Sequence, residues 1–228
     1  KPIIVIAVAK SSNSKTGNMV QTFIMREDIH PVEALQQGED KSVCGDCLAR
    51  PANGGWCYVR VEQSVVGVWK CFHKMPNARA KSGFFAGYAE ATSAEDIQAF
   101  GNGRAIRLGT YGDPAAVWNG YTHQWLTSPP EYSRYCMASI DQPCDTIAAE
   151  LLGYRCFVAV LPDESAGVTT RKSVGCPAAE ENGRKATCGD CMGCGGTDGR
   201  GTTNRVIEVH GVDFKTKRYA AWRQSIAA

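Results

Sequence analysis

The sequence has almost no net charge and no long apolar run. Its 25 Lys and Arg residues are balanced by 23 Asp and Glu residues, which leaves a formal net charge of +2 at pH 7. That balance excludes a global electrostatic attraction to nucleic acid, membrane surfaces or acidic partners. The longest apolar stretch, Ile3 to Ala9, is far shorter than the roughly 20 residues that span a bilayer, so no membrane partner is expected.

Signals for export, repeats and low-complexity tracts are also missing. Without a secretory h-region and cleavage site, we expect a cytoplasmic location, where cysteines stay reduced and serve as ligands. The polar segment Ser14 to Gly17 lacks the glycines of a GxxxxGK[ST] phosphate loop, so we interpret it as an ordinary turn. With 228 residues, 43% of them hydrophobic, the chain is expected to form one α/β domain over residues 1–228.

Cysteine, by contrast, is abundant, with 11 residues in the chain. Cys176-Pro is followed by Cys188-Gly-Asp-Cys191-Met-Gly-Cys194, within a cysteine-rich segment at 176–196. Thiolates at two-residue gaps can converge on one metal centre, and a CxxCxxC triplet with a separate Cys-Pro is typical of a cubane iron–sulfur cluster. The predicted 4Fe-4S ligands are Cys176, Cys188, Cys191 and Cys194. Zinc is the alternative metal, and free thiols or disulfides are the alternative to both.

A second group consists of Cys44, Cys47 and Cys57, in which Cys44-Gly-Asp-Cys47 repeats the string found at 188–191. Three cysteines without a fourth leave an open coordination position that a substrate or cofactor could fill. Alternatively, Cys71 or His73 completes the site and makes it structural. The remaining cysteines lack ligand spacing and are expected in the core: Cys136, Cys144 and Cys156.

Short apolar segments alternate with helix-like segments along much of the chain. Strands are expected at residues 3–9, 57–61, 105–110, 120–125, 135–141, 155–161 and 206–212. Helices are expected at residues 31–37, 65–75, 93–100, 113–118, 143–152 and 214–226. This alternation predicts βα units around a parallel sheet, in the form of a full or partial TIM-like β/α barrel.

Polar residues follow several of these strands, at the carboxyl ends where function gathers in barrels and open α/β sheets. They are Asp113, His123, Asp141, Asp163 and Glu164. Taken singly, the acids suit helix caps or solvated loops; together they suit metal or cationic-ligand binding, or acid–base chemistry. The candidate cofactor-binding residues are Gly112, Asp113, His123 and Asp141.

The carboxy-terminal segment interleaves basic residues with aromatic ones. Side chains such as Lys217 and Arg218 beside Tyr219 and Trp222 could grip single-stranded nucleic acid. The alternative is an ordinary helix that buries Phe214, Tyr219, Trp222 and Ile226 in one stripe. The second hypothesis for the whole chain is therefore a zinc-stabilised nucleic-acid-binding or replication-associated phage or plasmid protein.

The order of these parts resembles the radical-SAM superfamily: a cysteine loop, a strand ending in a glycine–acid–proline turn, further βα units and a cysteine-rich segment. The resemblance implies that Cys44, Cys47 and Cys57 bind a cluster whose open iron takes S-adenosylmethionine. It also implies that Gly112-Asp113-Pro contacts the methionine amine. The spacing of two and nine intervening residues differs from the CxxxCxxC of that superfamily.

A second resemblance covers nearly the whole chain. The strings at 11–17, 111–114, 120–125 and 137–139 are similar to those of phage- and plasmid-borne cysteine-rich proteins. That resemblance implies no established activity. Together, these observations predict an iron–sulfur protein with a radical-SAM-like barrel, and they leave open whether it is an enzyme.

Overall fold

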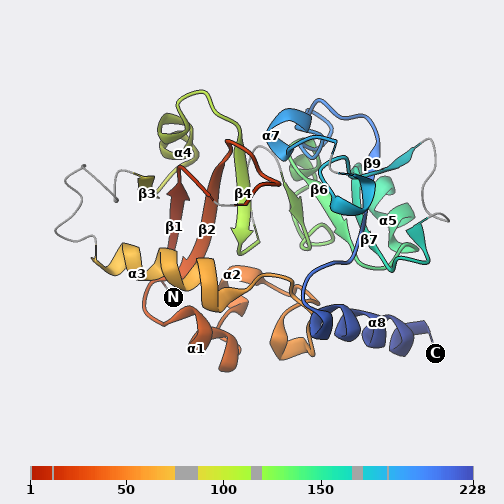
Figure 1. The fold of residues 1–228 in the computed structure, drawn as a ribbon, viewed down its shortest axis with the longest axis horizontal. Helices are drawn as coiled ribbons and strands as arrows, with labels where there is room; N and C mark the ends of the chain where they lie inside the picture. Colours follow the sequence, from red (N-terminus) through yellow and green to blue (C-terminus); the bar gives the residue numbers. More distant parts are fainter. Residues whose placement is uncertain are drawn as a thin grey trace.

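The structure is a computed structural model, which describes residues 2–11, 13–74, 87–113, 120–165, 172–183 and 185–227. The molecule is a mixed α/β protein with two sheets arranged beside each other (Figure 1). The predicted α/β class is confirmed. None of the helices in the described ranges is long and apolar enough to cross a bilayer.

The first sheet has the strand order β3-β1-β2-β4 and mixed direction. β1 (Ile3–Val8) pairs antiparallel with β2 (Val20–Arg26) and β3 (Tyr88–Ala91), and only β4 (Ile106–Tyr111) runs parallel to β2. A parallel crossover needs a dozen or more residues, usually with a helix. The connection over residues 9–19 has neither, so β2 returns antiparallel, and the predicted all-parallel arrangement is wrong for this half.

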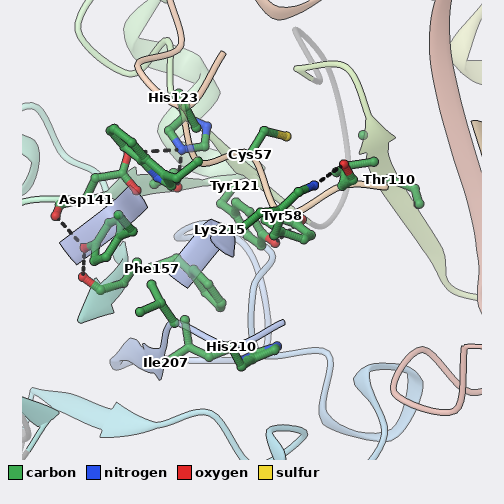
Figure 2. Close-up of a pocket in the computed structure, with 18 of the residues that line it drawn as sticks. Cys57, Tyr58, Thr110, Tyr121, His123, Asp141, Phe157, Ile207, His210 and Lys215 are labelled. Carbon is green, nitrogen blue, oxygen red and sulfur yellow. Dashed lines mark hydrogen bonds and ion pairs between the residues drawn. The ribbon is translucent and has the colours of Figure 1, made fainter. Parts of the chain in front are cut away.

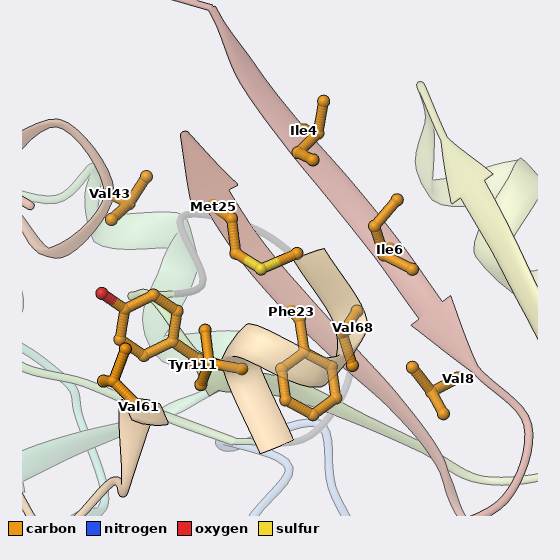
Figure 3. Close-up of a cluster of buried hydrophobic side chains, with 10 residues drawn as sticks. Ile4, Ile6, Val8, Phe23, Met25, Val43, Val61, Val68 and Tyr111 are labelled. Atoms are coloured by element: carbon orange, nitrogen blue, oxygen red, sulfur yellow. The ribbon is translucent and has the colours of Figure 1, made fainter. Parts of the chain in front are cut away.

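Helices cover one face of the first sheet. They are α1 (Pro31–Gln36), α2 (Lys41–Cys44) and α3 (Val66–Lys74), with a π-helical turn at Val61–Val65 before α3. Alternate residues of β1 point toward these helices because side chains of a strand repeat every second residue. The resulting buried cluster is shown in Figure 3 and contains Ile4, Ile6, Val8, Phe23, Met25, Val43, Val61, Val65, Val68 and Tyr111.

Helix α4 (Ala94–Gly101) connects β3 to β4 and begins where the sequence predicts. The Ser93 side chain accepts a hydrogen bond from the Asp96 backbone, and the Asp96 carboxylate accepts one from the Ser93 backbone. Such a reciprocal capping box satisfies two backbone donors at the helix start.

The second sheet is parallel throughout and has the order β5-β6-β7-β9-β8. Its strands are β5 (Tyr121–Thr122), β6 (Met137–Ile140), β7 (Cys156–Val160), β8 (Ser173–Gly175) and β9 (Asn204–Glu208). Helix α5 (Asp145–Leu151) forms the crossover from β6 to β7, and α8 (Asp213–Ala227) follows β9. The predicted parallel βα arrangement is confirmed for this half.

The two faces of this sheet differ. On β7, Cys156 and Val158 belong to a cluster that includes Ala149 of α5. Phe157, on the opposite face, packs with Cys176 of the cysteine-rich segment. That second face therefore carries the candidate site. Among the described residues, no strand pairing joins the two sheets into a closed ring.

Two local predictions are wrong. Residues 57–61 are not a strand: the chain stays unpaired and enters the π-helical turn at Val61. The backbone carbonyl of Val59 instead accepts a 2.8 Å hydrogen bond from Lys215 Nζ of α8. Cys144 is exposed rather than buried, whereas Cys136 and Cys156 lie in the core as expected. The helix expected at 113–118 lies largely outside the described residues.

Candidate functional site: two adjoining cysteine-lined cavities

The larger cavity, of about 420 Å³, lies at the carboxyl ends of the strands of the second sheet (Figure 2). All four candidate cofactor-binding residues and all three cysteines of the first group line it: Gly112, Asp113, His123, Asp141, Cys44, Cys47 and Cys57. The structure thus brings two sets that were predicted separately into one site. Asp163 and Glu164 do not line it, because Glu164 pairs with Arg223 at 2.8 Å.

His123 follows β5 directly, and two side chains hold its Nε2 atom. Its Nε2 lies 3.3 Å from Asp141 Oδ2 and 3.0 Å from Ser139 Oγ. Burial alone would lower the pKa of His123, but the Asp141 carboxylate and a hydrogen bond with Cys47 raise it well above its usual value. The imidazole therefore lies between a carboxylate and a thiol.

Asp113 anchors this part of the cavity. Its carboxylate accepts a 2.6 Å hydrogen bond from Thr122 Oγ1 and a 2.9 Å bond from the backbone N of His123. Its own backbone N donates to the Val43 carbonyl at 2.8 Å. Burial raises the pKa of Asp113, against the effect of these hydrogen bonds. Asp113 thus links the end of β5 to the loop that carries the first cysteine group.

The first cysteine group is built on a compact loop. The backbone N of Cys47 donates to Cys44 O at 3.2 Å, and that of Cys57 donates to Ala49 O at 2.9 Å. The loop is stabilised by a buried ion pair, in which Arg50 Nη2 lies 2.7 Å from Asp40 Oδ1. Burial, followed by the neighbouring thiols of Cys57 and Cys47, raises the pKa of Cys44. The three thiols are therefore neighbours in space.

The fourth ligands suggested by the sequence are not brought to this group. Cys71 lies on α3 and interacts with Tyr88. His73, also on α3, packs on Trp69 with a ring-centroid distance of 3.9 Å. Neither side chain lines the larger cavity.

The smaller cavity, of about 60 Å³, is lined by all four cysteines of the carboxy-terminal group: Cys176, Cys188, Cys191 and Cys194. Burial raises the pKa of Cys194 to about 12, and the other three thiols add to the shift. All 11 cysteines of the chain are free thiols.

Hydrogen bonds fix the backbone around the smaller cavity. Arg155, which precedes β7, donates to the carbonyls of Gly193 and Gly196, each at 2.8 Å, and to that of Thr203. The carbonyl of Cys194 accepts from the backbone N of Gly120 at 3.1 Å. The cysteine-rich segment is therefore attached at the amino-terminal ends of β5 and β7.

Basic side chains surround these thiols. Lys15, Arg107 and Arg205 line the smaller cavity. Arg205 Nε is buried and has no hydrogen-bond partner among the described residues. A buried donor without a partner costs about 1–3 kcal/mol, and the Nη1 of the same guanidinium donates to Thr203 Oγ1 at 2.9 Å.

No group of three or more His, Cys, Asp or Glu side chains is arranged to hold a metal ion in the part of the chain that the structure describes. In both groups the thiols surround a cavity without closing on one point. A metal centre in either group would therefore require the thiol side chains to reorient.

One layer of side chains separates the two cavities. Lys15, Arg107, Tyr121, Phe157 and Ala178 line both. The Tyr121 ring stacks on Phe157 at 4.3 Å with an interplanar angle of 12°, and Arg107 hydrogen-bonds to Tyr121. Sequence reasoning missed this wall, although Arg107 is the only charged residue of β4 and could have signalled it.

Helix α8 closes one side of the larger cavity. The Tyr219 hydroxyl lies 2.8 Å from the Asp141 carbonyl, and Trp222 packs on Trp56 with ring centroids 4.0 Å apart. Tyr219 is buried, while Phe214 and Ile226 are exposed. The predicted four-residue stripe is thus only partly present, and Tyr219 is not free to stack on a nucleic-acid base.

Fold and site together define a mixed α/β protein with two adjoining cavities, each carrying a group of cysteines. Comparison with known protein families, curated proteins and solved structures gave no match. The resemblances to radical-SAM and to phage- or plasmid-borne proteins therefore stay predictions.

Proposed function

We propose that the protein is an iron–sulfur protein whose 4Fe-4S cluster is held in the smaller cavity. The observation that carries the proposal is that four thiols line one cavity together with three cationic side chains. Its ligands would be Cys176, Cys188, Cys191 and Cys194. A cluster held by four thiolates is anionic, and Arg205, Arg107 and Lys15 supply compensating positive charge.

The spacing of the cysteines in the sequence favours a cluster over a single zinc ion. With Zn–S distances of about 2.3 Å, tetrahedral zinc draws its four sulfurs to about 3.8 Å from one another. A cubane places each cysteine on a separate iron and so keeps the sulfurs farther apart. Both geometries would require the thiols to reorient, so the choice of a cluster rests on the CxxCxxC triplet with its separate Cys-Pro.

For the architecture, we propose a partial β/α barrel around the larger cavity. Thr110 of β4, in the first sheet, lines this cavity together with Phe157 and Ile207 of the second sheet. Both sheets thus contribute to one wall. His123 and Asp141 line the larger cavity. The cluster would lie in the smaller cavity, on the other side of the Tyr121–Phe157 layer, a position suited to a structural or electron-transfer role.

Metal analysis after anaerobic purification tests the proposal. We expect brown protein with iron and sulfide in 4Fe-4S stoichiometry. Cys188→Ser and Cys194→Ser should lose most of the iron, whereas Cys144→Ser, an exposed cysteine outside both cavities, should keep it. Zinc without iron in the wild-type protein would overturn the cluster and leave the zinc hypothesis.

S-adenosylmethionine is the ligand that the superfamily resemblance implies, and it would need a second cluster with an open iron on Cys44, Cys47 and Cys57 in the larger cavity. Equilibrium binding to the iron-loaded protein, followed by cleavage on reduction, would support a radical enzyme. Absence of both would remove the radical-SAM part of the proposal and leave the cluster itself untouched.

A further inference from the structure

The first cysteine group has an imidazole as its neighbour. His123 and all three thiols line the larger cavity, and the next residue, Gln124, donates to the Cys44 carbonyl at 3.3 Å. Cys57 and His123 lie at the same edge of that cavity in Figure 2. We infer that Cys44, Cys47, Cys57 and His123 form a second, mononuclear metal site for a zinc-type divalent cation.

Two tethers hold His123 against the cysteine loop. The Gln124 amide donates to Cys44 O at 3.3 Å and accepts from the Asp46 backbone N at 3.5 Å. A Cβ added at Gly45, whose φ is +56°, would lie 2.7 Å from the same amide. The second tether is Asp113, which bonds to the Val43 carbonyl and to the His123 backbone.

The surroundings of His123 match those of a metal-bound histidine. A histidine ligand almost always donates its other ring N–H to a carboxylate, a carbonyl or water. Asp141 and Ser139 both lie at Nε2, which leaves Nδ1 for the metal. Asp141 is then a positioning residue, which fixes the ring without touching the ion.

Binding of the ion requires the thiol side chains to reorient. The thiols do not close on one point in this structure, but a change between staggered rotamers moves a cysteine sulfur by about 3 Å. Three thiolates and a divalent cation carry one net negative charge, which the neighbouring cation Lys215 offsets. Cys₃His is an ordinary set of zinc ligands in structural sites.

A fourth ligand from the protein changes the chemistry of this group. In the superfamily that the chain resembles, three cysteines leave an open iron for S-adenosylmethionine. Here the imidazole fills the fourth position, so the site is closed and structural. This second site does not depend on the cluster in the smaller cavity.

Metal content of the full chain, purified anaerobically and loaded with iron and zinc, tests the inference. We expect about one zinc per chain in the wild type in addition to iron. Cys47→Ser and His123→Ala should lose the zinc and keep the iron, whereas Cys188→Ser should lose the iron and keep the zinc. His210 lines the same cavity and donates from Nδ1 to the Glu208 carbonyl, and His210→Ala should change neither metal.

Two further variants distinguish the loss of a metal ligand from a general loss of folding. His123→Cys should restore binding, because sulfur also ligates zinc, and with Co²⁺ it should shift the ligand-field bands relative to the wild type. Asp141→Asn should lower zinc affinity by roughly 10- to 100-fold while leaving the stoichiometry at saturation unchanged. Unchanged zinc in His123→Ala, or iron bound by the three cysteines in that variant, would overturn the inference.

Discussion

Arg155 is the residue whose replacement most directly tests how the cysteine-rich segment is held. The guanidinium is buried and donates to the carbonyls of Gly193 and Gly196 in that segment and to that of Thr203, which follows it. Arg155→Met keeps much of the side-chain length but removes every donor. The carbonyls of Gly193, Gly196 and Thr203 would then lose their charged partner inside the protein.

The magnitude follows from these contacts. Each hydrogen bond to a charged group contributes about 1.5–3 kcal/mol, and the three act on one segment, so their effects do not simply add. Arg155 Nε is itself buried without a partner, and removing it recovers part of the loss. We therefore expect a loss of about 3–5 kcal/mol in the free energy of unfolding, which is less than the full sum of three such hydrogen bonds.

Urea unfolding of the reduced, metal-free chain measures this value. With an m-value of about 2 kcal/mol/M, the midpoint should fall by about 2 M while m is unchanged. The matched control is Arg134→Ala, which removes an exposed 2.9 Å ion pair with Asp198, two residues after that segment. That control should shift the midpoint little, because exposed ion pairs are screened by water. Equal shifts in the two variants would refute the anchoring role of Arg155.

Three further outcomes are expected. Ile6→Ala, in the fully buried cluster of β1, should lower the free energy of unfolding by about 2–5 kcal/mol in urea melts and leave metal content unchanged. Gly112→Ala should destabilise the protein, because φ is +81° and the new Cβ would lie 2.6 Å from Ile24 Cβ; an unchanged melting temperature would contradict this. The hydrogen bond from Arg26 lowers the pKa of Asp28, so this pair stabilises the folded protein above the unfolded-state pKa of Asp28. That stabilisation is lost as the pH falls through the folded-state pKa. Asp28→Asn should therefore make the free energy of unfolding depend less steeply on pH in the acidic range.

The parallel half of the fold was predictable because its pattern is local. From β6 to β7 the chain follows the simple succession of strand, helix and strand, and the glycine after α5 marks the helix end. The first half depends on connection length instead: residues 9–19 are too few for a crossover. The short strands β3 and β8 carry no alternating pattern, and only pairing with β1 and β9 makes them strands.

In the candidate site, too, local features could be predicted from the sequence and contacts between distant segments could not. Two-residue gaps bring Cys188, Cys191 and Cys194 together whatever the rest of the chain does, so their grouping could be expected from the sequence. The approach of His123 to Cys47 could not, because it depends on how the end of β5 packs against a loop attached to the other sheet. Local spacing contains no information on that packing.

The single wall between the two cavities has an electrostatic consequence. A charge gained on one side acts on a ligand on the other through protein rather than through bulk water. At a separation on the order of 10 Å and an effective dielectric constant of about 20, two unit charges interact by about 1.7 kcal/mol, which corresponds to more than a tenfold change in affinity. By thermodynamic linkage the influence is mutual, so occupancy of either compartment shifts the binding equilibrium of the other.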